Sequence, residues 1–414
     1  MRAPGPVFPR FLLFTLAASL AAPCLAQSTA PATANVPLVY STTPMTRNAD
    51  LMLSASIISV TATEAGLANI SPSLFRSANW KARTVRAVKL ALFDVPVVTY
   101  FAGLNHEWGH LTRATEFNVE SQLSFVGSPW SFKAFTLQSL SEIPAHRLAM
   151  ASIHGGGLAA ARVLKDRAEM RMLGAERVPA GHALPAVIPG LDEWLYATHN
   201  LSPGNFADPE TLSRLQGDVS TFVKDLVFRR SGPGASLDTT RGRVRARSAL
   251  NLLDAALWSE AAGILEDYVW KGEPDVRIRW AGIGGVHLLP SLRYELSPYG
   301  PEYYVRSHYR VADFMGTGYG RWTEQIGIDR QVGGGLSIGV RSSPRVRPAI
   351  SVDVWSQNVE GMGMRGELQA DLARWPHERA ALTVAVGAKS SGYLLGFPLD
   401  RGAYINAGVN VRVW

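Results

Sequence analysis

The feature that most restricts the fold is a change in the spacing of apolar residues near Glu273 and Pro274. After that point apolar side chains recur at every second position, with charged or polar side chains between them. A period of two places the two kinds of side chain on opposite faces of a β-strand. The segments with this pattern are 276–280, 292–296, 305–310, 322–328, 336–340, 350–354, 368–372, 382–386, 393–397 and 405–413. Residues 273–414 are therefore predicted to form an antiparallel β-barrel of about ten strands.

Residues 79–272 have helical spacing instead. Helices are expected at about 79–116, 144–173, 191–198, 209–229 and 244–269. Pro96 is expected to kink or restart the first of them. No apolar run in this region reaches the roughly 18 uncharged residues of a spanning helix. The predicted fold class is α+β, with an N-terminal α-helical domain at 79–272 and the barrel at 273–414.

Three consecutive glycines, Gly155 to Gly157, interrupt the second expected helix just after His154. Each glycine inside a helix costs about 1 kcal/mol relative to alanine. Such a cluster indicates that another backbone comes close, and the first helix is the expected neighbour.

The N-terminus has the pattern of a secretory signal peptide. Arg2 and Arg10 precede a short apolar run at 11–22, and Cys24-Leu25-Ala26 supplies a cleavage site, so residues 1–26 are expected to be removed. Pro23 fits poorly with a lipoprotein signal at Cys24. Cleavage after Ala26 leaves a mature chain without cysteine, which excludes disulfides and thiolate metal ligands. Residues 27–78 are expected to begin as a mobile leader and have no assigned structure beyond it.

The formal net charge of +7 does not indicate a nucleic-acid-binding protein. Most arginines are scattered among acidic residues, and the main basic patch is the short stretch 241–247. In an exported chain such a patch fits a solvated helix or anionic lipid headgroups. Nucleic acid is therefore not an expected partner.

A metal-binding pattern lies on the first expected helix. His106 and His110 are four residues apart, so one helical face presents both imidazoles to a single ion. Glu107 lies between them, where it can act as a general base. These positions, His-Glu-x-x-His, resemble the zincin metallopeptidases. The resemblance implies Zn²⁺ held by His106 and His110, with Glu107 catalytic. The alternative is a pair of structural histidines beside a solvated glutamate.

A catalytic zinc site needs a third protein ligand. His154 is favoured because the glycines beside it allow its helix to pack on the first one. Glu116 lies at the spacing of the third metzincin ligand, but Arg113 stands where that family has a helix-breaking glycine. Glu193 and Glu260, on later helices, are the other candidates.

The C-terminal region resembles an outer-membrane β-barrel, because one face of its strands is nearly all apolar and the other carries many charges. The chain ends on an aromatic residue, Trp414, although on the polar parity. The resemblance implies apolar side chains facing outer-membrane lipid and a helical domain in the periplasm. The alternative is a soluble barrel or sandwich with its apolar face inward.

The predicted function is zinc-dependent hydrolysis, of a peptide or protein substrate, at a bacterial-type cell envelope. The alternative is a non-enzymatic outer-membrane barrel, structural or for transport, with a helical periplasmic domain.

Overall fold

The structure, a computed structural model, describes residues 34–75, 77–138, 146, 148–172, 177–203, 217–230, 236–326, 329–340, 346–374 and 380–413. It has a helical N-terminal part followed by a large antiparallel sheet, which confirms the α+β order of the chain. The predicted signal peptide, residues 1–26, and Trp414 lie outside the described residues.

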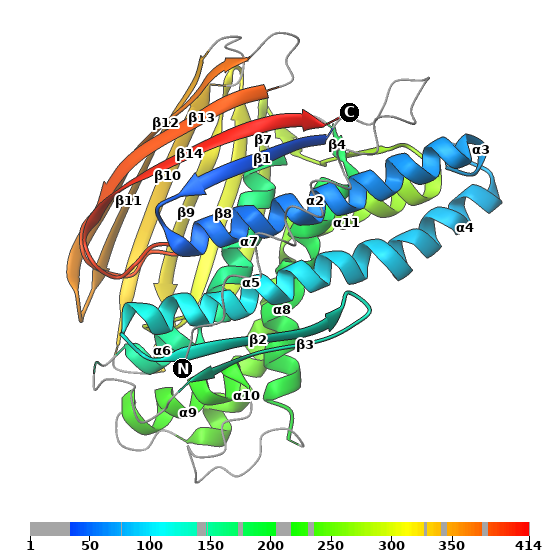
Figure 1. Ribbon diagram of the computed structural model, residues 1–414. Coiled ribbons are helices and arrows are strands. Elements are labelled where there is room, and N and C mark those ends of the chain that lie inside the picture. Colours follow the sequence, from blue (N-terminus) through cyan, green and yellow to red (C-terminus); the bar gives the residue numbers. More distant parts are fainter. Residues whose placement is uncertain are drawn as a thin grey trace, which may run out of the picture.

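The helices gather on one side of the sheet (Figure 1). They are α2 (Pro44–Ile70), α3 (Pro72–Phe75), α4 (Trp80–Lys89), η2 (Leu90–Asp94), α5 (Val95–Glu116), α6 (Ala149–His154), α7 (Gly156–Met172), α8 (Ala180–Asn200), α9 (Asp218–Arg230), α10 (Leu237–Ser248), η4 (Ala249–Leu253), α11 (Ala255–Gly263) and η5 (Ile264–Lys271). A hairpin of β2 (Ser121–Ser128) and β3 (Ser131–Gln138) packs along α5.

The main sheet has ten strands in the order β1-β14-β13-β12-β11-β10-β9-β8-β7-β6. They are β1 (Ala34–Ser41), β6 (Ala281–Ile283), β7 (Val286–Ser297), β8 (Gly300–Val311), β9 (Phe314–Thr323), β10 (Gln331–Val340), β11 (Val346–Gln357), β12 (Gly361–Arg374), β13 (Ala380–Lys389) and β14 (Gly402–Val413). The closed barrel predicted from the sequence is absent among the described strands, because the hydrogen-bonded order ends at β1 and β6. β1 pairs with β14, so a strand from the unassigned segment 27–78 extends the C-terminal sheet.

Two segments predicted as barrel strands have other structures. Residues 276–277 belong to β5 (Asp275–Arg277), which pairs with β4 (Arg177–Pro179) in a separate small sheet. Residues 393–397 form a loop between β13 and β14. Gly392, just before this run, and Gly396, inside it, have positive φ angles of 118° and 83°, which interrupt the extended conformation. Tyr393 and Phe397 are both buried in this loop.

Pro96 changes the first predicted helix in an unusual way. The helix continues from Trp80 to Glu116, but its hydrogen bonding is π-helical over η2, just before the proline. Pro96 cannot donate a hydrogen bond to the carbonyl of Leu92. The indole Nε1 of Trp130, at the tip of the β2–β3 hairpin, donates to that carbonyl oxygen at 2.5 Å. The hairpin therefore satisfies an acceptor that the proline leaves open.

Helices α5 and α7 come into backbone contact at glycines. A Cβ placed on Gly109 would lie 2.2 Å from the carbonyl oxygen of Gly156, and one placed on Gly156 would lie 2.6 Å from that of Gly109. Both distances are shorter than any tolerated contact, so the two glycines are required by the approach of the helices. This confirms the close approach that the glycine cluster predicts.

The other side of α7 lies against charged residues of the sheet. Arg162 donates to Glu295 of β7 at 2.6 Å. Glu169 accepts from Arg293 at 3.3 Å, from Arg306 and from Lys165. The charged parity predicted for these strands is thus turned towards α7 and buried.

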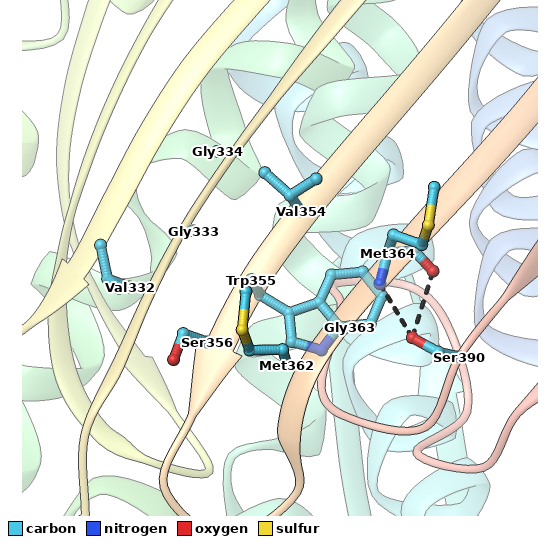
Figure 2. Close-up of a pocket in the computed structure, with 10 residues that line it drawn as sticks. All are labelled: Val332, Gly333, Gly334, Val354, Trp355, Ser356, Met362, Gly363, Met364 and Ser390. Atoms are coloured by element: carbon cyan, nitrogen blue, oxygen red, sulfur yellow. Dashed lines mark hydrogen bonds between the residues drawn. The ribbon is translucent and has the colours of Figure 1, made fainter.

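From β8 to β14 the opposite parity is largely apolar and exposed, whereas Tyr294 and Leu296 of β7 are buried. Its exposed members include Val305, Phe314, Trp322, Val332, Leu336, Ile338, Ile350, Val352, Val354, Met364, Leu368, Val386 and Ile405. Figure 2 shows a shallow apolar depression on these strands, where Trp355 pairs with Gly333 on one neighbouring strand and Gly363 on the other. Gly363 and Gly392 leave room for the indole ring, because a Cβ on either would lie within 2.5 Å of it.

Two helical stretches, Pro44–Ile70 and Trp80–Glu116, are long and apolar enough to cross a membrane by length and composition. The second stretch has no uncharged run of 18 residues, because Asp94 and Glu107 interrupt it. Core helices pass the same test, and half of the apolar window in Pro44–Ile70 is buried inside the protein.

Replacing Glu169 by alanine is expected to lower the free energy of unfolding by about 3–5 kcal/mol. The change removes the buried carboxylate that Arg293, Arg306 and Lys165 share, and Asp166 and Asp254 then remain as their main partners. Chemical denaturation measures this change. Glu266→Ala is the matched control: Glu266 is an exposed carboxylate paired with Lys271. Equal unfolding midpoints for the two variants would contradict the structural role of Glu169.

Candidate metal centre

His106 and His110 lie one turn apart on α5, as the sequence predicts. Both are buried, with 3% of each residue exposed, and Glu107 between them is 8% exposed. The ring centroids of the two histidines are 5.0 Å apart. Glu107 is therefore largely shielded from solvent, whereas the alternative considered from the sequence placed it in solvent.

The Nδ1 atom of each imidazole has an acceptor behind it. Nδ1 of His110 lies 2.7 Å from the main-chain oxygen of Ile153, at the end of α6. Nδ1 of His106 lies 3.2 Å from Oδ2 of Asp192 on α8. A carbonyl oxygen only accepts hydrogen bonds, so His110 must carry a proton on Nδ1. Metal-bound histidines commonly have an outer partner of this kind, which orients the ring and leaves Nε2 to face the metal.

The two Nε2 atoms converge on one carboxylate oxygen. Oδ2 of Asp218, the first residue of α9, lies 3.0 Å from Nε2 of His106 and 3.2 Å from Nε2 of His110. One ligand atom from each of these residues lies within 4.8 Å of the others. With Nδ1 protonated, a neutral His110 presents a lone pair to this anionic oxygen. That arrangement is favourable only with a proton or a cation between them.

The electrostatics of the metal-free site agree with this view. Burial lowers the pKa of His106, but Tyr196, Asp192 and Asp218 outweigh it and raise the pKa well above its usual value. The pKa of His110 is also raised, because Asp218 outweighs burial. Burial raises the pKa of Asp218, but His110 and His106 lower it by more, so its pKa is lowered overall. Positive charge in this position is therefore stabilised.

Gly157 keeps the space beside the Nε2 atoms open. A Cβ on Gly157 would lie 2.3 Å from Nε2 of His106 and 2.5 Å from Nε2 of His110. Any side chain there would occupy the point on which the ligand atoms converge. The donor set of two imidazoles and one carboxylate, with this space, suits Zn²⁺.

Two further side chains contact the site. The ring of Tyr196, on α8, stacks on His106 with centroids 4.8 Å apart and an angle of 26°. His106 lowers the pKa of Tyr196, but burial and the nearby carboxylates raise it to a net value of about 12. Tyr196 thus keeps its proton at neutral pH. Thr136, on β3, contacts Glu107.

His154, the favoured third ligand in the sequence analysis, is outside the group of converging atoms among the described residues. It ends α6, and its buried Nε2 has no hydrogen-bond partner in the described part of the chain. Burial lowers its pKa to about 4. His154 is thus a neutral imidazole near the site, close enough for Asp218 and His110 to influence its pKa.

The carboxylates proposed as alternative ligands have other neighbours. Glu116 pairs with Arg113 at 2.8 Å. Glu193 lies 3.6 Å from Arg162, and burial raises its pKa to about 8. Glu260 is buried with Lys165 and Asp254 among its charged neighbours, and burial raises its pKa well above its usual value. None of the three belongs to the converging group among the described residues.

Asp218 and Asp192 were missed by the sequence analysis. Residues 209–229 were expected to form one helix; α9 begins at Asp218, and residues 209–216 lie outside the described part of the chain. An aspartate at a helix start usually signals a cap, so its identity as a ligand depends on tertiary packing. The local signal is Gly217, whose positive φ of 85° marks the helix start.

No protein-family model matches the sequence, and no curated protein matches it. Among solved structures, the chain is similar to one described as "NanC porin structure in rhombohedral crystal form". The identity is 10% and the TM-score 0.24, over 32% of this chain and 74% of that chain. These comparisons do not assign the chain to a family.

Gly157→Ala is expected to abolish stoichiometric zinc binding, because its Cβ would overlap both Nε2 atoms. Metal content after dialysis and calorimetric titration measure the loss. Gly66→Ala, where a Cβ meets nothing within 4 Å, is the matched control and should bind zinc like the unmodified chain. Asp218→Ala should weaken binding as well, while zinc binding unchanged in all three variants would rule out this centre.

Proposed function

We propose that the chain is a zinc-dependent hydrolase, with a peptide bond as the leading substrate. The observation that carries the proposal is the convergence of two Nε2 atoms and one carboxylate oxygen, with an acceptor behind each imidazole. None of the comparisons with known proteins supports hydrolysis, so the proposal rests on this side-chain geometry and on the His-Glu-x-x-His spacing.

The residues of the site divide the chemistry between them. His106, His110 and Asp218 would hold the ion, and zinc there would polarise a carbonyl group and lower the pKa of a water molecule towards about 7. Glu107 accepts a proton from the attacking water and returns it to the leaving amine. Tyr196 retains its phenolic proton and can donate a hydrogen bond near His106. Asp192 and the carbonyl of Ile153 fix the two imidazole rings.

Glu107→Gln is expected to retain zinc and to lose at least about 100-fold in kcat, the lower range for removal of a general base. Hydrolysis of casein or a peptide library, measured with zinc content on the same samples, tests this. Glu120→Gln is the control, because Glu120 is an exposed glutamate just after the end of α5. Unchanged hydrolysis by Glu107→Gln would assign any activity elsewhere.

We also propose that the exposed apolar face of the main sheet contacts outer-membrane lipid, with the helical part in the periplasm. This face continues across neighbouring strands from β8 to β14, whereas soluble monomers rarely expose apolar patches beyond a few hundred Å². The charged residues of β7 and β8 on the inward face pair with α7. The soluble sandwich considered from the sequence would bury the apolar face, which the described strands leave exposed.

A second candidate function is a structural or transport protein of the outer membrane without catalysis. The observation in its favour is that the apolar sheet and its buried ion pairs to α7 need no metal for their explanation. Metal content separates the two functions: a purified chain without stoichiometric zinc, in which His106→Ala changes nothing, would favour the second.

Outer-membrane attachment is tested by fractionation and by gel migration with and without heating. We expect the protein in the outer-membrane fraction with heat-modifiable migration, because folded membrane sheets resist detergent unfolding at low temperature. Replacement of Val352 and Val354 by lysine should reduce membrane recovery by adding charges to the apolar face. Lysine at the exposed Asp238, on α10, is the control. A freely soluble periplasmic protein would contradict the assignment.

A further inference from the structure

The β2–β3 hairpin is fixed to α5 by aromatic contacts. The ring of Tyr100 on α5 lies 4.8 Å from that of Phe125 and 5.5 Å from that of Phe132, both in edge-to-face geometry. Phe132 also lies where a Cβ on Gly103 would meet it at 2.9 Å. Such packing leaves little freedom for β3 to move along α5.

Alternation along β3 turns Thr136 towards α5 together with Phe132. Its hydroxyl lies 2.9 Å from Oε2 of Glu107 and 3.1 Å from the main-chain oxygen of the same residue. A threonine hydroxyl has one proton, and an ionised carboxylate is the stronger acceptor. The bond to Oε2 engages one of the two carboxylate oxygens, and the other remains as a proton acceptor.

We infer that Thr136 is a positioning residue, which holds the Glu107 carboxylate in the orientation needed for proton transfer. The inference rests on the proposed function and adds a residue that lies outside the His-Glu-x-x-His segment. The hairpin connects Thr136 to α5. Aromatic packing fixes β3 against this helix, and the hydroxyl of Thr136 then holds the carboxylate of Glu107. A role limited to packing would require only the shape of the side chain.

Thr136→Val and Thr136→Ser separate these roles. Valine retains the shape and removes the hydroxyl, whereas serine retains the hydroxyl and removes a methyl group. For Thr136→Val we expect kcat to fall on the order of tenfold, with KM and zinc content unchanged, because a misplaced base lowers the rate of the chemical step. Serine should restore most of kcat. Equal kcat for valine and the unmodified chain, or equal losses for both variants, would overturn the inference.

A second measurement does not depend on activity or metal. The infrared difference between each chain and its Glu107→Gln counterpart isolates the carboxylate stretching bands of Glu107. Loss of a hydrogen-bond donor should shift these bands in Thr136→Val and leave them in place in Thr136→Ser. Identical bands in all three chains would overturn the inference. If the unmodified chain binds no zinc and hydrolyses nothing, the proposed function fails, while the infrared bands still decide the role of Thr136.

Discussion

The position of α7 between α5 and the sheet is the constraint on which the site and the fold both depend. On one side, Gly156 allows backbone contact with Gly109 of the histidine helix. On the other, Arg162 and Glu169 pair with buried charges of the sheet. One face of α7 thus carries small residues against α5, and the opposite face carries long charged residues against the sheet. The same helix therefore fixes the distance from α5 to the strands.

The candidate metal centre combines parts of the chain that are far apart in sequence. Two imidazoles come from α5, the carboxylate from α9, and the outer acceptors from α6 and α8. Each imidazole is fixed at both ring nitrogens, so the cost of ordering the ligands is met during folding rather than at metal binding. The β2–β3 hairpin adds Thr136 from the remaining side. These side chains therefore have their arrangement without a bound ion.

Local spacing in the sequence predicted the features of this structure that depend on neighbouring residues, and it did not predict those that depend on tertiary packing. Period-two spacing located most of the strands, the glycine cluster indicated the contact of α5 with α7, and four-residue spacing paired His106 with His110. The third group, Asp218, could not be found in this way, because nothing local distinguishes a ligand from a helix cap. The prediction of a closed barrel was also wrong for the described strands. Alternation shows which side chains share a face of a strand, but it does not show which strands pair. The apolar spacing of Tyr393 and Phe397 matched a strand, but the segment is a loop in which Gly392 and Gly396 have positive φ.

The pairing of β1 with β14 has a consequence for how the protein matures. These strands are the first and last described elements of the chain, yet they are hydrogen-bonded neighbours over eight residue pairs. β1 therefore cannot pair with its neighbour until the final strand has been synthesised. Contacts of such wide sequence separation form late and slowly. Until then β1 has an unpaired strand edge, which can pair with the wrong strand or with another chain.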